Sequence, residues 1–286
     1  MPHRRLLFLL ALLALVALDA CNAADLARRR ADRYFGEGMY PEAMAEYENV
    51  LQAEGDSYDT YYSLGDCLRR LNRWEEACAR FEQAKALAPQ YPEAHERLGE
   101  CYGELKQTDK AEAAWLELLK LDPKRLKAND AMGDINFDRQ RYEAAAGYYE
   151  VYLSQKPDDE GVVTSYGAAL IALKKYDTAI QMLEKFVLSQ PAHVNGRFNL
   201  GVAYMGAHRN DDALREFTVV TELAPSFADG WIHLAAANVR LGDMQRAIDV
   251  FERAKSRGFS DWERVETDPD FETVRQLDRY KALAKR

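Results

Sequence analysis

The residues from Tyr58 to Tyr91 form a pattern that recurs along the chain at a spacing equal to its own length. With Tyr58 as position 1, positions 4, 7, 8, 11, 20, 24 and 27 are apolar or small, and position 32 is proline. Positions 4 to 11 and positions 20 to 27 each follow the three- and four-residue spacing that places side chains on one face of a helix. The pattern therefore predicts two amphipathic helices in each repeat, the second ended by the proline.

Seven such repeats follow one another without an insertion, over residues 24–57, 58–91, 92–125, 126–159, 160–193, 194–227 and 228–261. Position 8 is Gly or Ala in every repeat, position 20 is always Ala, and position 24 is always large. The small residues allow the two helices of a repeat to approach closely, and the large residue fills the space between them. Unbroken repetition predicts one continuous solenoid rather than separate globular domains.

The repeat resembles the tetratricopeptide repeat (TPR) in its length and in its small, large and proline positions. The resemblance implies an all-α fold, a right-handed α-solenoid of seven helix-turn-helix TPR units. In this family, positions 2, 5, 9 and 12 line a concave groove in which peptides bind. On an ideal helix these positions lie about 130° around the axis from the packing face. Function is therefore expected on this second face.

Both ends of the array depart from the pattern. In the first repeat Arg30 occupies position 7, as expected for an end repeat whose outer face has no neighbour. After the seventh repeat, Asp268 followed by Pro269 is typical of a helix start. An apolar face then follows at three-residue steps, formed by Phe271, Val274, Leu277, Tyr280 and Leu283. We expect residues 262–286 to form a helical cap, a capping helix on the seventh repeat.

Residues 1–20 predict a signal peptide, because basic residues precede an apolar run from Leu6 to Leu18. This run is shorter than a bilayer span, which needs roughly 20 residues. The end of the segment resembles the bacterial lipobox, which implies lipidation of Cys21, although Asp19 departs from that motif. Ordinary cleavage near Ala23 or Ala24 is the alternative. Either outcome predicts an exported protein, periplasmic or lipid-anchored to the outer membrane.

The sequence offers little for catalysis. No Gly-rich phosphate loop, nucleophile motif or helical metal-ligand spacing occurs, so we expect no enzyme activity, no cofactor and no metal. Cys67, Cys78 and Cys101 are expected to be small buried residues, and a Cys67–Cys78 disulfide across one helical hairpin is the alternative.

The expected groove changes character along the chain. Nine of the twelve residues at positions 2, 5 and 9 of the first four repeats are acidic, whereas the last three repeats carry small and apolar residues there. An exposed apolar patch usually marks an interaction site. For the acidic half, a solvated helix face is the alternative. For the apolar half, the alternatives are burial by the curvature of the array and coverage by the chain's own tail. The predicted partner-binding residues are Asp59, Tyr62, Asp66, Glu93, Glu96, Glu100, Asp130, Asp134, Phe198, Val202, Met205 and Ile232.

These features predict a protein- or peptide-binding scaffold or adaptor of the bacterial envelope, acting in envelope assembly or secretion. Its partner would present basic and apolar segments. The net charge of −9 argues against nucleic acid, and leaves the N-terminal lipid as the only expected membrane contact. The clamp with which some TPR domains hold a C-terminal carboxylate has no match in this chain. A self-assembling oligomer and a regulatory subunit of an enzyme complex are the alternatives.

Overall fold

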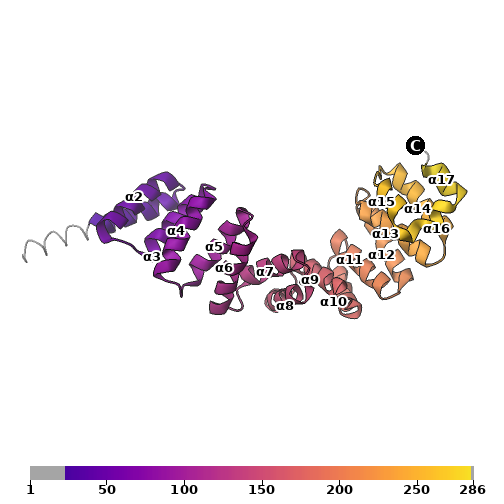
Figure 1. Ribbon diagram of the computed structural model, residues 1–286, viewed down its shortest axis with the longest axis horizontal. Coiled ribbons are helices and arrows are strands. Elements are labelled where there is room, and N and C mark those ends of the chain that lie inside the picture. Colours follow the sequence, from indigo (N-terminus) through magenta and orange to yellow (C-terminus); the bar gives the residue numbers. More distant parts are fainter. Residues whose placement is uncertain (1–22, 285–286) are drawn as a thin grey trace, which may run out of the picture. The chain divides into compact units, whose positions relative to one another are not determined.

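The computed structural model describes residues 23–284, which form helices joined by short turns and contain no strand (Figure 1). Each repeat supplies two helices. The first repeat contains a helix described over residues 23–36 and α2 (Tyr40–Glu54). The next three repeats supply α3 (Tyr58–Arg70), α4 (Trp74–Leu87), α5 (Pro92–Glu104), α6 (Thr108–Leu121), α7 (Leu126–Asp138) and α8 (Tyr142–Leu153). The last three supply α9 (Glu160–Ala172), α10 (Tyr176–Ser189), α11 (Val194–Gly206), α12 (Asn210–Leu223), α13 (Ala228–Arg240) and α14 (Met244–Ser256).

The chain forms two compact parts, the first ending at Met132 and the second beginning at Gly133, so the division falls within α7. In the first part, the helices from α2 to α6 pack each against the next. In the second part, the same holds from α8 to α14. Each repeat thus buries its apolar faces against its neighbours, which makes the fold an all-α solenoid as predicted.

The closest approach inside a repeat lies between the glycine at position 8 and the large residue at position 24. A Cβ atom on Gly65 would lie 2.6 Å from Cε1 of Phe81, too close for real atoms. The same overlap would occur between Gly99 and Trp115, Gly133 and Tyr149, and Gly201 and Phe217, while Gly167 faces Leu183 with more space. The large side chains at position 24 are buried in all these repeats. In the four repeats that combine glycine with a ring, the ring occupies the space that a side chain on the glycine would take.

The turn between the two helices of every repeat has one residue in the left-handed backbone region. This residue is at position 15, and its φ lies between 56° and 83°. The seven residues are Gly38, Asn72, Lys106, Gln140, Lys174, His208 and Gly242. Glycine adopts this conformation without steric cost, and the five inner repeats adopt it with other residues. The feature recurs at the spacing of the sequence repeat, although the residue types at position 15 do not reveal it.

A side-chain donor closes the turn between successive repeats. Nε2 of His95 lies 2.8 Å from the carbonyl oxygen of Pro89, and Nε1 of Trp231 donates to the carbonyl of Pro225 at 2.8 Å. Asn129 and Arg197 make the equivalent bonds to Pro123 and Pro191. All four donors occupy position 4 and all four acceptors are the proline at position 32 of the preceding repeat. Each of these prolines lies two residues beyond the end of the preceding helix, so the bonds give a carbonyl group of the connecting turn a partner.

The tail packs on the seventh repeat as several short segments, and the expectation of one capping helix is wrong. The segments are α15 (Trp262–Thr267), η1 (Pro269–Phe271), α16 (Glu272–Gln276) and α17 (Asp278–Ala284). Leu277 is extended, with ψ of 135°, and separates the last two. Phe271 and Tyr280 are buried against Phe251 of α14, with ring centroids 5.1 and 6.1 Å away.

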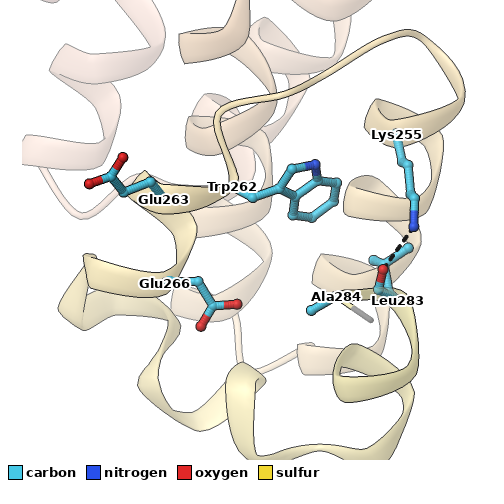
Figure 2. A pocket seen from close by; sticks show the side chains of 6 residues that line it. All are labelled: Lys255, Trp262, Glu263, Glu266, Leu283 and Ala284. Carbon is cyan, nitrogen blue, oxygen red and sulfur yellow. Dashed lines mark hydrogen bonds between the residues drawn. The ribbon is translucent and has the colours of Figure 1, made fainter. Parts of the chain in front are cut away.

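Polar contacts also hold the tail in place. Lys255 of α14 donates to the carbonyl oxygen of Leu283 at 2.9 Å, beside a pocket that Trp262 and Glu266 also line (Figure 2). Nη1 of Arg275 donates to the carbonyl oxygens of Val265 and Asp268 at the end of α15. The break in the tail thus allows both its apolar side chains and its backbone carbonyls to find partners.

We predict that Gly133→Ala destabilises the protein by about 1–3 kcal/mol, because the added methyl group overlaps the buried ring of Tyr149. Gly167→Ala is the matched control. There the new Cβ would lie 3.1 Å from Cδ2 of Leu183, whose side chain can shift, and alanine favours the helix by about 1 kcal/mol. Urea unfolding should show a loss for the first variant and little change for the second. Equal effects would contradict the assigned contact.

Candidate groove and its pocket

The predicted partner-binding residues lie on the first helices of successive repeats, but they differ in exposure. Asp59, Glu93 and Asp134 are exposed; Tyr62, Asp66, Glu100, Asp130, Phe198 and Val202 are partly buried; Glu96, Met205 and Ile232 are buried. Residues at equivalent repeat positions therefore differ in solvent exposure, and repeat position alone does not predict which of them a partner can reach. The residues of the two parts of the chain are described separately below.

In the first part, the predicted acidic face is a network of ion pairs. Glu96 accepts from Nε of Arg125 at 2.6 Å, and Glu100 accepts from Nη1 of Arg97 at 2.9 Å and from Nζ of Lys127 at 2.5 Å. These cations come from the same repeat and from the start of the next one. Two of the carboxylates that the sequence offered to a basic partner, Glu96 and Glu100, are therefore already compensated within the chain.

A third carboxylate extends this network toward the preceding repeat. Oδ1 of Asp66 lies 2.7 Å from Nε of Arg69 and 3.5 Å from Nε of Arg97. Nε of Arg97 also donates to the hydroxyl oxygen of Tyr62 at 3.2 Å. Arg97 thus links groove residues of two repeats, and its half-buried guanidinium is surrounded by their acceptors.

Burial and pairing compete in setting the charge of these groups. Burial works against the charged form of Glu100, but the hydrogen bond from Lys127 and the charge of Arg97 outweigh it, so the pKa of Glu100 is lowered. Burial likewise opposes the charge of Arg97, yet its neighbours Tyr62 and Glu100 raise its pKa. The hydrogen bond with Glu96 raises the pKa of Arg125. Glu100, Arg97 and Arg125 are consequently charged at neutral pH.

In the second part, the groove positions of α7, α9 and α11 form an open pocket of about 440 Å³. Its lining residues are Asp134, Phe137, Asp138, Tyr149, Thr164, Ser165, Ala168, Asn195, Phe198 and Asn199. Nδ2 of Asn199 donates to the carbonyl oxygen of Thr164 at 3.0 Å, which joins two repeats at the floor of the pocket. The hydroxyl of Tyr149 donates to Oδ1 of Asp134 at 2.7 Å. The pocket therefore combines aromatic walls with amide, hydroxyl and carboxylate groups.

Phe198 is held in the pocket wall by three other rings. Its ring centroid lies 5.8 Å from that of Phe217, 5.1 Å from Phe227 and 4.9 Å from His233. His233 is thus packed between the rings of Phe198 and Phe217. Burial lowers the pKa of His233 and its hydrogen bond to the carbonyl oxygen of Asp229 only partly offsets this. The wall beside Phe198 is consequently uncharged at neutral pH.

The predicted exposed apolar patch is wrong at Met205 and Ile232, which are 6% and 2% exposed. Ile232 belongs to the same core cluster as Val265 and Phe271 of the tail. Arg264 of the tail pairs with Asp229, which lies three residues before Ile232 on α13. The tail therefore covers the groove face of the seventh repeat, and Phe198 and Val202 are the members of the predicted patch that stay partly exposed.

Several pocket residues were missed as candidates. Phe137 is at position 12 and Asn195 at position 2, so the groove stripe already contained the signal for both. Ser165 and Asn199 at position 6 and Asp138 at position 13 lie beside that stripe, and only the packing of neighbouring repeats brings them to the pocket.

The remaining predictions concern the N-terminal segment, metal binding and membrane-spanning helices. Cys21 and the signal peptide lie outside the described residues. Between residues 23 and 284, no group of three or more His, Cys, Asp or Glu side chains could hold a metal ion. Over the same range, no helix has the length and apolar character needed to cross a membrane.

We predict that Glu100→Gln costs roughly 1–3 kcal/mol at pH 7, because Arg97 and Lys127 lose their shared charged acceptor. The lowered pKa of Glu100 means that its contribution is complete above its ordinary value of 4.5 and is lost as pH falls through the lower folded value. The gap between variant and wild type should therefore narrow below about pH 4 in urea unfolding series. Glu104→Gln, at an exposed position of the same helix, is the control. A pH-independent gap would show that the charge is not responsible.

The comparisons with known proteins agree with this geometry. Residues 97–160 and 200–261 match the family model described as tetratricopeptide repeat, and residues 36–118 match that described as anaphase-promoting complex, cyclosome, subunit 3. Among curated proteins, no sequence matches the chain.

Solved structures share the fold at low sequence identity. The crystal structure of YrrB, described as a TPR protein with an unusual peptide-binding site, has a TM-score of 0.61 at 16% identity, covering 64% of this chain and 95% of its own. The C-terminal part of a TPR repeat-containing protein from Cytophaga hutchinsonii has a TM-score of 0.64 at 16% identity, covering 87% and 99%. PilW, described as a widely conserved type IV pilus biogenesis factor, has a TM-score of 0.54 at 19% identity, covering 76% and 97%. The solved structures agree in fold, and the family-model matches, with the repeat of the sequence and the helix pairs of the structure, identify the chain as a tetratricopeptide repeat protein.

Proposed function

We propose that this TPR protein is a non-enzymatic adaptor that binds a segment of a partner protein in the pocket of α7, α9 and α11. The observation that carries the proposal is the pocket itself, about 440 Å³ in volume and lined by groove positions of three successive repeats. Concave sites with apolar walls and a few polar groups are where proteins bind ligands. The groove face of the seventh repeat is covered by the tail, and that of the second and third repeats is bridged by ion pairs.

The lining residues indicate the kind of segment that fits. Phe137 and Phe198 provide aromatic surface for an apolar side chain, and the carboxylates of Asp134 and Asp138 favour a Lys or Arg beside it. The amide group of Asn195 can bond to the backbone of an extended peptide. We therefore propose a partner segment with an apolar residue next to a basic one.

Two related folds support this setting by analogy. YrrB is described by its peptide-binding site, and PilW as a pilus biogenesis factor. They are only 16% and 19% identical to this chain, so they support the adaptor role through a shared fold only. An envelope-assembly or secretion role is part of the proposal. Its support is this analogy together with the predicted signal peptide at residues 1–20.

Peptides selected from a random displayed library against the wild-type protein should carry an apolar residue beside Lys or Arg. Asn195→Lys should weaken their binding at least tenfold, equivalent to about 1.4 kcal/mol, because the new cation repels the basic side chain. Phe198→Ala should cost about 1–3 kcal/mol if its ring anchors the apolar residue. Titration calorimetry measures both effects.

Gln181→Lys is the matched control, since it adds the same charge at an exposed site on α10 outside the pocket. Asn195 is itself exposed, so we expect Asn195→Lys to have the same stability as the wild type. A change in peptide binding would then not result from unfolding. If the peptides bind Asn195→Lys and Phe198→Ala as tightly as they bind the wild type, the pocket is not the site. A wild-type dimer in solution that Phe198→Ala separates would instead favour self-assembly.

We also propose that the protein is exported and carries lipid on Cys21. The support is the sequence alone: a basic start, an apolar run from Leu6 to Leu18 and a cysteine shortly after it. Radiolabelled palmitate should enter the wild type and Cys67→Ala in bacteria, but not Cys21→Ser. An unlabelled wild type, or equal labelling of Cys21→Ser, would exclude lipidation.

A further inference from the structure

The three cysteines of the described chain are buried free thiols, and a hydrogen bond joins two of them, Cys78 and Cys101. Cys78 of α4 and Cys101 of α5 belong to one core cluster, together with Leu98 and Ala114. Cys67 of α3 belongs to a different cluster. The neighbour of Cys78 is therefore a cysteine of the next repeat, not the cysteine of its own helical hairpin.

The repeat accounts for this pairing. Cys101 is at position 10 and Cys78 is at position 21 of the repeat before it. Cys67 is also at position 10, and position 21 of its preceding repeat is Met44, which packs against the cluster that contains Cys67. Position 10 thus faces position 21 of the preceding repeat, and only between the second and third repeats are both residues cysteine.

The two thiols also differ in their chemistry. The hydrogen bond with Cys101 lowers the pKa of Cys78, and burial opposes this only in part. The same hydrogen bond, together with burial, raises the pKa of Cys101. Cys78 is 6% exposed and Cys101 is fully buried. Cys78 is therefore the more nucleophilic and the more accessible of the two sulfurs.

A surface opening lies next to Cys78. Glu82 and Lys110, whose charges act on the Cys78 thiol, line an open pocket of about 330 Å³. Leu98 and Ala114 line the same pocket and belong to the cluster that contains both cysteines. The pocket thus shares residues with the surroundings of Cys78, which keeps a small exposed fraction of 6%.

We propose that Cys78 and Cys101 form a redox pair that a small-molecule disulfide converts into a covalent link between the second and third repeats. The Cys78 thiolate attacks one sulfur of the oxidant, whose S–S bond breaks and releases one thiol. Cys101 then loses its proton to solvent and its sulfur attacks Cys78, which releases the second thiol. The protein loses two protons and two electrons, and the oxidant takes them up to become two thiols.

The link would tie α4 to α5 covalently. Cross-linking residues 78 and 101 restricts the unfolded chain, so the oxidised first part should melt about 5–10 °C higher than the reduced one. The proposal is independent of the groove ligand, and an exported chain would meet the oxidising conditions that favour it.

To test it, the reduced wild-type protein is incubated with glutathione disulfide, remaining thiols are alkylated, and digested peptides are identified by mass spectrometry. The expected product is a peptide pair joined through Cys78 and Cys101, with Cys67 alkylated. Cys101→Ala should stop at the glutathione mixed disulfide on Cys78. Cys67→Ala, the control, should form the link as the wild type does.

Alanine is a suitable replacement at position 10, because Ala169, Ala203 and Ala237 occupy it in three other repeats. Circular dichroism melting of the oxidised and reduced wild type supplies the second readout. A link that contains Cys67, a wild type that stops at the mixed disulfide, or identical melting temperatures of the two forms would overturn the proposal.

Discussion

The contact between the glycine at position 8 and the large residue at position 24 is the constraint on which the rest of the structure depends. It sets how closely the two helices of a repeat approach, as Gly133 and Tyr149 illustrate. Because each helix pair also packs on the next pair, the same spacing is passed from repeat to repeat. The packing residues are therefore buried in the core, and positions such as 2, 5 and 9 lie on the groove face.

The same groove positions serve different purposes along the array. In the first part, Glu96 and Glu100 are paired with Arg97, Arg125 and Lys127 and so contribute to the cohesion of neighbouring repeats. In the second part, the groove face of α7, α9 and α11 retains an open pocket. The acidic composition of these positions therefore did not predict their availability. A carboxylate that is already paired with a cation of the same chain gains little from a basic group of a partner.

The tail shows how the end of a solenoid is closed. Its apolar side chains continue the core of α14, and Arg264 reaches Asp229 on the groove face of α13. A single long helix would align these side chains on one face, but it would leave Arg275 unable to reach the carbonyl oxygens of Val265 and Asp268. Broken segments satisfy both the apolar and the polar requirements of an exposed end.

By itself, the sequence determined the helix pairs, the repeat and its packing face, and the stripe on which the pocket lies. The helix pairs, the repeat and the packing face follow from local periodicity, because residues three or four apart share a helix face. The stripe follows from the resemblance to the tetratricopeptide repeat, in which it lines the groove. Only the tertiary structure decided which groove residues are available. The pairing of Arg97 with Asp66, the burial of Ile232 near the tail and the meeting of Cys78 with Cys101 all join different repeats or segments. Such contacts depend on how neighbouring helices are stacked, and the spacing of residues within one repeat carries no information about them.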